Sequence, residues 1–131
     1  MDVDGTVIVR EAVAEDLPRL RWLHHQLYPE HEATDERVAA AAWANIAETP
    51  GRSVYVAEVA GAVVGGADVT MMANLAHRGE PYLLVENVVV DSAHRRRGVG
   101  AALLDAAAER GRAAGCYKLQ LSTEDRDAFA F

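Results

Sequence analysis

Three consecutive arginines followed by two glycines are the residues whose types most clearly indicate chemistry. The arginines are Arg95, Arg96 and Arg97, and the glycines are Gly98 and Gly100. Guanidinium groups bind phosphate oxygens through charge-assisted hydrogen bonds. Glycine has no Cβ, so a bulky anion can approach the backbone closely. The segment predicts a phosphate site, and a pyrophosphate is its natural occupant; a solvated charge run beside a flexible turn is the alternative.

The elements on either side of this segment would position it. The run 82–90 is almost entirely apolar and β-branched, which is typical of a strand buried on both faces. From Gly98 onward, apolar residues recur at helical spacing, so a helix is expected to begin at the glycines. The first turn of a helix has N–H groups without partners and a dipole that favours negative charge. A strand, a basic turn and a helix N-terminus together favour an anion-binding function.

Two common phosphate motifs do not fit this segment. A dinucleotide motif requires a third glycine where Leu103 stands, and a P-loop requires Gly-Lys-Ser/Thr, which is absent. Residues 95–100 instead match the Arg/Gln-x-x-Gly-x-Gly/Ala signature, and the chain resembles the GNAT superfamily of acyl-CoA-dependent N-acyltransferases. The resemblance extends to the opening at 8–17, to the fourth strand at 86–91 and to 115–119, which is similar to glucosamine-phosphate acetyltransferases.

The resemblance implies an N-acetyltransferase that moves an acetyl group from acetyl-CoA to a primary amine of a small molecule or peptide. It implies that the fourth-strand backbone pairs with the pantetheine amides of CoA and that the basic turn holds the pyrophosphate. The cofactor-binding residues carried over in this way are Val88, Val89, Val90, Arg95, Arg96, Arg97, Gly98, Val99, Gly100 and Ala101. A non-catalytic CoA-binding or interaction module that kept the cleft is the alternative, and a nucleotide-binding regulatory domain is a third possibility.

Glu86 is the candidate catalytic residue. Acetyl transfer needs a neutral amine, a stabilised carbonyl oxygen and protonation of the leaving thiolate. Glu86 is a carboxylate in an apolar strand, where partial burial would raise its pKa towards neutrality and suit a general base. It also matches the strand glutamate of many family members. Binding the acceptor amine or a structural role are the alternatives, and the Val88 N–H is the expected donor to the carbonyl oxygen.

The acceptor is expected to enter, by the same resemblance, between the first two helices and the loop before the fourth strand. The candidate acceptor-binding residues are Tyr28, Glu30 and His31, together with Glu86. Acidic side chains around 30–36 would attract a cationic amine, although a solvated helix entry explains them equally well. No metal site is expected, because His24 and His25 are adjacent on a helix and diverge in direction.

The expected fold is α/β (α+β), a mixed and mostly antiparallel sheet with the order β-α-α-β-β-β-α-β. The expected strands are 6–10, 53–59, 62–72, 82–90 and 117–122, and the helices begin near Glu15, Thr34 and Gly98. The second helix is expected to turn Val38, Ala42 and Ile46 inward. The resemblance implies that the fourth and fifth strands splay apart around acyl-CoA.

Composition limits the classes of protein and partner. The chain has 131 residues, half of them hydrophobic, so we expect a single domain over 1–131. A formal net charge of −7 argues against nucleic acid as a partner. No apolar stretch or signal-peptide pattern suggests a membrane, and one cysteine, Cys116, fits a reducing, cytoplasmic location.

The end of the sequence departs from the family pattern. The family has a helix after the fifth strand, with a tyrosine that protonates the thiolate, and then a hairpin. Residues 127–131 resemble the start of that helix, and the sequence ends at Phe131. The domain is therefore expected to be truncated before the final helix and hairpin, with Tyr117 in the wrong segment to replace the tyrosine. An uncovered fifth strand would invite pairing with another chain, so a homodimer is possible.

Overall fold

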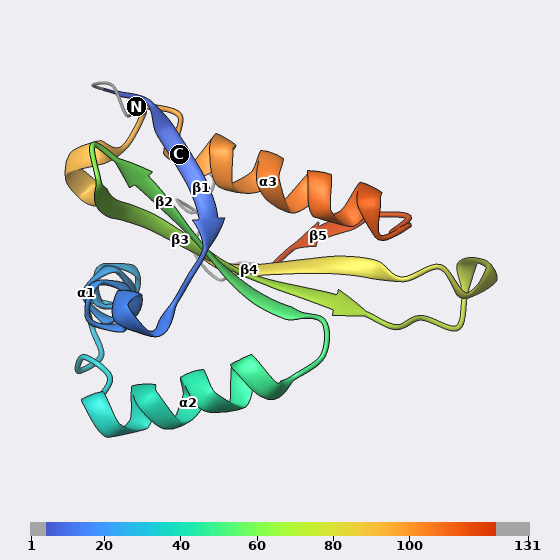
Figure 1. The fold of residues 1–131 in the computed structure, drawn as a ribbon, viewed down its shortest axis with the longest axis horizontal. Helices are drawn as coiled ribbons and strands as arrows, with labels where there is room; N and C mark the ends of the chain where they lie inside the picture. The colour runs from blue at the N-terminus through green and yellow to red at the C-terminus, as the bar shows by residue number, and fades with distance from the viewer. Residues whose placement is uncertain (1–4, 123–131) are drawn as a thin grey trace.

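A five-stranded sheet forms the centre of the molecule, seen in a computed structural model that describes residues 5–122 (Figure 1). Its strand order is β1-β2-β3-β4-β5. The strands are β1 Val7–Glu11, β2 Arg52–Val59, β3 Ala62–Met72, β4 Tyr82–Val90 and β5 Leu119–Leu121. The helices are α1 Leu17–Leu27, α2 Glu36–Glu48 and α3 Val99–Ala113.

Strand pairing confirms the expected mixed sheet. The first four strands pair with their neighbours in antiparallel fashion, and β4 and β5 are parallel because α3 connects them. The ranges expected for β3 and β4 agree with the structure. The fifth strand is shorter than the expected 117–122, because the Tyr117 N–H bonds to the Pro81 carbonyl before the regular pairing begins at Leu119.

Helices cover both faces of the sheet. Figure 1 shows α3 on one side and α1 with α2 on the other. On the α3 side, Val64, Val85, Val90, Val99 and Leu103 belong to one buried cluster. On the other side, Leu20, Leu23, Val54, Val56 and Val89 form a second cluster, against which Trp43 and Ile46 of α2 pack. The sheet thus separates two hydrophobic cores, one under α3 and one under α1 and α2.

Two adjacent glycines in β3 set how closely the helices approach the sheet. A Cβ on Gly65 would lie 2.9 Å from Cγ1 of Val99 and 3.0 Å from the Val89 carbonyl oxygen. A Cβ on Gly66 would lie 3.0 Å from Cδ2 of Leu20 on the opposite face. The missing side chain of Gly65 therefore lets the first turn of α3 rest directly on the sheet.

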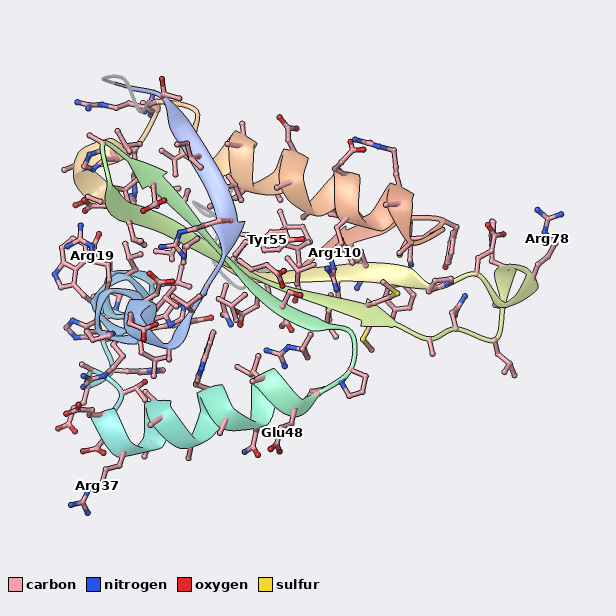
Figure 2. The ribbon with its side chains drawn as sticks, in the orientation of Figure 1. Arg19, Arg37, Glu48, Tyr55, Arg78 and Arg110 are labelled. Atoms are coloured by element: carbon pink, nitrogen blue, oxygen red, sulfur yellow. The ribbon has the colours of Figure 1, made fainter. Side chains whose placement is uncertain are left out.

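The second helix presents part of its expected face to the core. Asp35 caps it, accepting a hydrogen bond from the Arg37 N–H at 2.8 Å. The expectation that Val38 points inward is wrong, because its side chain is 59% exposed. The expectation for Ile46 is confirmed, since Ile46 packs against the core together with Trp43. Arg37 and Glu48 lie on its outer side (Figure 2).

Two further predictions concern membrane-spanning helices and the C-terminal end of the chain. Within residues 5–122, no helix is long and apolar enough to cross a membrane. The expected start of a helix at 127–131 and the chain end at Phe131 lie outside the described residues.

Candidate functional site

The helix α3 begins at Gly98 as the sequence predicts, with Gly98 and Ala101 exposed and Val99 and Gly100 buried. Gly98 is the N-cap and has φ +83°, the left-handed conformation that glycine adopts without cost. The Ala102 N–H bonds to the Gly98 carbonyl, so the N–H groups of Val99, Gly100 and Ala101 precede the first helical bond. A Cβ on Gly98 would meet no atom within 4 Å, so the space beside the helix start is open.

The three arginines surround this helix end with uncompensated charge. Arg95, Arg96 and Arg97 are all exposed, and within residues 5–122 none of them forms an ion pair. Among the described residues, the one side-chain hydrogen bond of the three runs from Arg95 Nε to the Val90 carbonyl at 3.5 Å. Arginines with spare donors beside a helix N-terminus form an anion site on a chain whose net charge is −7.

A buried carboxylate that sequence reasoning missed fastens this loop to the fold. Asp91 ends β4 and is only 6% exposed. Its carboxylate accepts hydrogen bonds from the His94 ring at 3.0 Å, if Nδ1 carries a proton, and from Gln26 of α1 at 3.3 Å. Burial alone would raise the pKa of Asp91, but the hydrogen bonds from Gln26, His94 and the Ala93 N–H outweigh it and lower the pKa. The basic loop is thus anchored on α1 and on the sheet.

A β-bulge interrupts β4 beside Glu86. Asp68 pairs with Glu86 and Gly66 pairs with Val89, so β4 takes three steps where β3 takes two. Asn87 absorbs the extra residue with φ +53°, and its side-chain amide donates to Asp68 Oδ2 at 2.8 Å. The expectation of a regular strand missed this bulge, although an asparagine within an apolar run was the signal, because asparagine tolerates positive φ.

Glu86 is not buried as the sequence suggested. Its side chain is exposed, so the expectation of partial burial is wrong. The reason is that β5 pairs with β4 only over Leu83–Val85, so within the described chain no strand flanks Glu86 on that side. Glu86 instead lies directly opposite Asp68 on the face of the sheet that α1 and α2 cover. Its role as a base stays a prediction.

The two last strands part at the level of Glu86. The final described bond between them joins the Ser122 N–H to the Val85 carbonyl at 2.9 Å. Beyond it, Val89 and Val90 pair with Gly66 and Gly65 on the β3 side, and within residues 5–122 no strand pairs with their other edge. The backbone of 88–90, expected to contact CoA, therefore lies along the open edge that leads to the arginine loop.

The candidate acceptor residues separate into two groups. Tyr28 ends α1 and its hydroxyl lies 3.5 Å from Asn87 Oδ1, next to the bulge. Its ring stacks on His31 with centroids 5.9 Å apart. Glu30 and His31 are exposed and form only a 4.0 Å contact with each other. The structure thus brings Tyr28 to Asn87, the residue after Glu86, and holds His31 against the Tyr28 ring, whereas Glu30 lies in the turn beyond α1.

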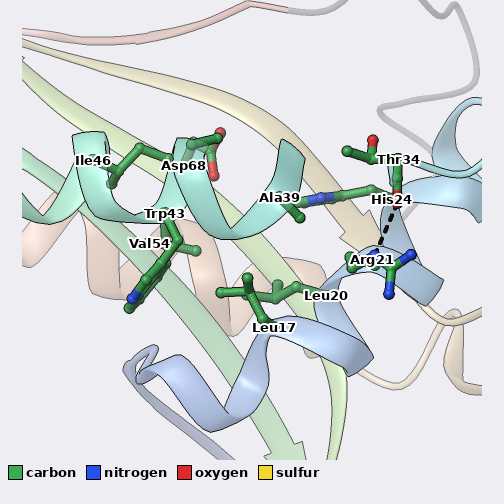
Figure 3. Close-up of a pocket in the computed structure, with 11 residues that line it drawn as sticks. Leu17, Leu20, Arg21, His24, Thr34, Ala39, Trp43, Ile46, Val54 and Asp68 are labelled. Carbon is green, nitrogen blue, oxygen red and sulfur yellow. Dashed lines mark hydrogen bonds between the residues drawn. The ribbon is translucent and has the colours of Figure 1, made fainter. Parts of the chain in front are cut away.

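A cavity of about 190 Å³ lies between α1, α2 and the sheet (Figure 3). Two of its polar residues are His24 of α1 and Asp68 of β3. Burial lowers the pKa of His24, and the negative charge of Asp68 opposes this shift only in part. Sequence reasoning considered His24 only as a metal ligand and overlooked Asp68, whose carboxylate within a β-branched strand was the available signal.

The chain is similar to known proteins in sequence and in fold. The model of the acetyltransferase (GNAT) family matches residues 17–131. A glucosamine 6-phosphate N-acetyltransferase of Trypanosoma brucei brucei is 33% identical over 88 residues, which are 63% of this chain; the chain spans only 60% of that relative's length. An Agrobacterium tumefaciens str. C58 protein named as an acetyltransferase is 34% identical, with 92% of this chain and 83% of that chain covered and a TM-score of 0.85.

A third comparison shows likeness of fold. The aminoglycoside N-acetyltransferase AAC(6')-Iy, solved in complex with CoA, is 22% identical with a TM-score of 0.76. The match covers 93% of this chain and 80% of that one.

Proposed function

This chain belongs to the acetyltransferase (GNAT) family, and we propose that it transfers an acetyl group from acetyl-CoA to a primary amine of a small molecule. The observation that carries the proposal is the α3 N-terminus, where exposed arginines without ion-pair partners in the described chain surround an open Gly98. Relatives support the same reaction class: one is named for acetylating glucosamine 6-phosphate, and another of like fold was solved with CoA.

The proposed binding mode of CoA follows the edge of β4. The pyrophosphate binds the free N–H groups of the first turn of α3 and the guanidinium groups of Arg95, Arg96 and Arg97. The backbone of 88–90 pairs with the amides of the pantetheine arm along the edge left open by β5. Acetyl-CoA supplies the activated acetyl group as a thioester, and the chain supplies its position and its electrostatic surroundings.

The chemical step requires two proton movements. The acceptor ammonium loses a proton, to Glu86 directly or through water, and the freed nitrogen attacks the thioester carbon. A C–N bond forms while the C–S bond breaks, and the second proton that the nitrogen loses is matched by the proton that the thiolate leaving group takes up. The proposed donor to the carbonyl oxygen is the Val88 N–H beside the bulge. Tyr117 is not assigned as the thiolate acid, because it bonds to Pro81 and stacks on His77 at the start of β4, whereas the arginine loop follows the end of that strand.

Calorimetry with CoA and an assay of thiol release from acetyl-CoA with a panel of amines test the proposal. We expect the wild-type chain to bind CoA and Arg95→Ala to bind it roughly 10–150-fold more weakly, since a hydrogen bond to a charged group contributes about 1.5–3 kcal/mol. Arg112→Ala is the control, because Arg112 pairs with Glu109 near the other end of α3. Equal CoA affinity in both variants would contradict the pyrophosphate site, and binding without thiol release would indicate a non-catalytic CoA-binding module.

A further inference from the structure

We propose that the cavity between α1, α2 and the sheet holds the carbon skeleton of the acceptor, and that this acceptor is a primary amine carried on an alkyl or arylalkyl group. Its ammonium would lie between Asp68 and Glu86. This inference rests on acetyl transfer as the proposed function and names the class of acceptor.

The lining of the cavity is mostly apolar. Seven of its eleven residues are apolar, namely Leu17, Leu20, Ala39, Ala42, Trp43, Ile46 and Val54. Figure 3 shows the Trp43 ring beside Val54, with Leu17 and Leu20 of α1 to their right. Removing sugar hydroxyls from water in such a cavity would leave most of them without partners, which costs free energy. An alkyl or aromatic group gains free energy from the same transfer.

The acidic side of the cavity comes from one row of paired residues across the sheet. Val54 of β2 pairs with Asp68 of β3, and Asp68 pairs with Glu86 of β4. Side chains directly opposite each other on antiparallel strands have Cβ atoms about 4.5–5.5 Å apart. Val54 and Asp68 line the cavity, so Glu86 continues the same row beyond it. The two carboxylates are therefore neighbours and can share one ammonium.

The charges around this pair leave room for a cation. Asp68 is held by the Asn87 amide at 2.8 Å and by Arg52, whose guanidinium is 3.8 Å away. Arg52 balances one of the two negative charges of Asp68 and Glu86, and an ammonium would balance the other. Arg21, which lines the cavity, lies apart from Asp68 in Figure 3 and donates its Nε hydrogen bond to the Thr34 carbonyl at 2.9 Å.

His24 completes the polar lining without adding charge near neutral pH. It faces Asp68 and Arg21 around the cavity. Because burial lowers its pKa, the imidazole is neutral at pH 7 and does not repel an incoming ammonium.

The acidic side of the cavity lies close to the proposed site of acetyl transfer. Asp68 bonds to Asn87, and Asn87 immediately precedes Val88, whose N–H is the proposed donor to the thioester carbonyl. An amine held between Asp68 and Glu86 would thus be next to the bulge of β4. Asp68 and Asn87 thus connect the cavity with the open edge of β4, along which CoA is proposed to bind.

Fluorescence can report on the cavity independently of CoA. The chain has two tryptophans, and Trp22 lies outside the cavity, 44% exposed with the Arg19 guanidinium 4.0 Å over its ring. In Trp22→Phe, Trp43 is the only tryptophan. We expect 2-phenylethylamine to change its emission in a saturable manner, and glucosamine 6-phosphate at equal concentrations to leave it unchanged. A change in emission with glucosamine 6-phosphate and none with 2-phenylethylamine would overturn the inference.

A matched pair of variants on α2 tests the cavity in turnover. Ala39 lines it, and Ala41 is exposed on the same helix. Ala39→Leu fills part of the cavity and should raise KM for 2-phenylethylamine about 10-fold or more, whereas Ala41→Leu should behave as wild type. Leucine forms helices nearly as well as alanine, so both substitutions should be tolerated, and circular dichroism checks that each variant folds.

The outcomes separate this inference from the proposed function. Two results would overturn the acceptor class while acetyl transfer stands. One is an equal KM for 2-phenylethylamine in Ala39→Leu and Ala41→Leu, and the other is a higher kcat/KM for glucosamine 6-phosphate than for 2-phenylethylamine. Failure of the wild type to bind CoA would overturn acetyl transfer, and the Trp43 titration would still support or contradict an arylalkylamine site.

Discussion

Gly65→Ala is the substitution that most directly tests how the fold positions the anion site. The new methyl group would lie 2.9 Å from Val99 Cγ1, 3.0 Å from the Val89 carbonyl oxygen and 3.3 Å from Leu103 Cδ1. The Val89 oxygen belongs to the sheet and cannot yield, so Val99 must move by a few tenths of an ångström. Val99 is the first residue of α3, whose first turn carries the N–H groups proposed to bind phosphate.

The expected size of the effect follows from two opposing contributions. Overpacking a core typically costs about 1–3 kcal/mol, and replacing a strand glycine by alanine returns roughly 0.5–1 kcal/mol. The free energy of unfolding should therefore fall by roughly 0–2.5 kcal/mol. The CoA dissociation constant should rise roughly 3–10-fold, because a binding group displaced by about half an ångström loses its geometry.

Gly66→Ala is the matched control on the other face of the same strand. Its Cβ would lie 3.0 Å from Leu20 Cδ2, the end of a flexible side chain, and 3.4 Å from the Tyr55 carbonyl oxygen. Leu20 can move, so stability should change by less than about 1 kcal/mol and CoA affinity should stay at the wild-type value. Urea unfolding and calorimetry measure both quantities. Equal losses of CoA affinity in the two variants, or none in Gly65→Ala, would refute the reasoning.

Two further predictions concern ionisable groups. Glu86→Gln should lower the acetylation rate about 100-fold or more at neutral pH while CoA binding stays intact, and the loss should be smaller at high pH, where the amine deprotonates unaided. An equal loss of rate at every pH would assign Glu86 to amine binding. Glu48→Gln, on the outer side of α2, is the control. His24 has a pKa lowered by burial, so the unfolded chain takes up its proton first and the folded state loses stability as the pH falls below 6.5. His24→Gln should flatten the dependence of the unfolding free energy on pH between pH 7.5 and 5. Parallel profiles for the wild type and His24→Gln would contradict this prediction. The lowered pKa of Asp91 affects stability in a separate pH range, below its ordinary value of 3.8.

The parts of the site that sequence predicts well are those built from local order. Residues 82–100 contain a strand, a basic turn and a helix start in unbroken sequence, and the structure reproduces all three. Gly98 adopts the left-handed conformation, which glycine tolerates better than other residues, so its residue type alone suggests this conformation. The spare charge of the arginines also follows from the sequence, since three neighbouring cations rarely find three local carboxylates.

The cavity could not be predicted in the same way, because distant segments build it. His24, Trp43 and Asp68 come from α1, α2 and β3, and their meeting depends on how each helix is rotated against the sheet. On α2, Val38 was predicted to face inward and is exposed, whereas the inward position of Ile46 was predicted correctly. The exposure of Glu86 depends on where β5 stops pairing with β4, which no residue near Glu86 encodes.

The bulge at Asn87 explains how one strand serves both faces of the molecule. In a regular strand, residues 86, 88 and 90 would share one face. The extra residue reverses this alternation, so Glu86 and Val89 lie on the side of α1 and α2, while Val88 and Val90 pack on the α3 side. Val90 can then join the core beneath α3, just before Asp91 and the arginine loop, while Glu86 stands beside Asp68. A single asparagine in the left-handed conformation thus makes the proposed acceptor site and the proposed CoA site compatible within one strand.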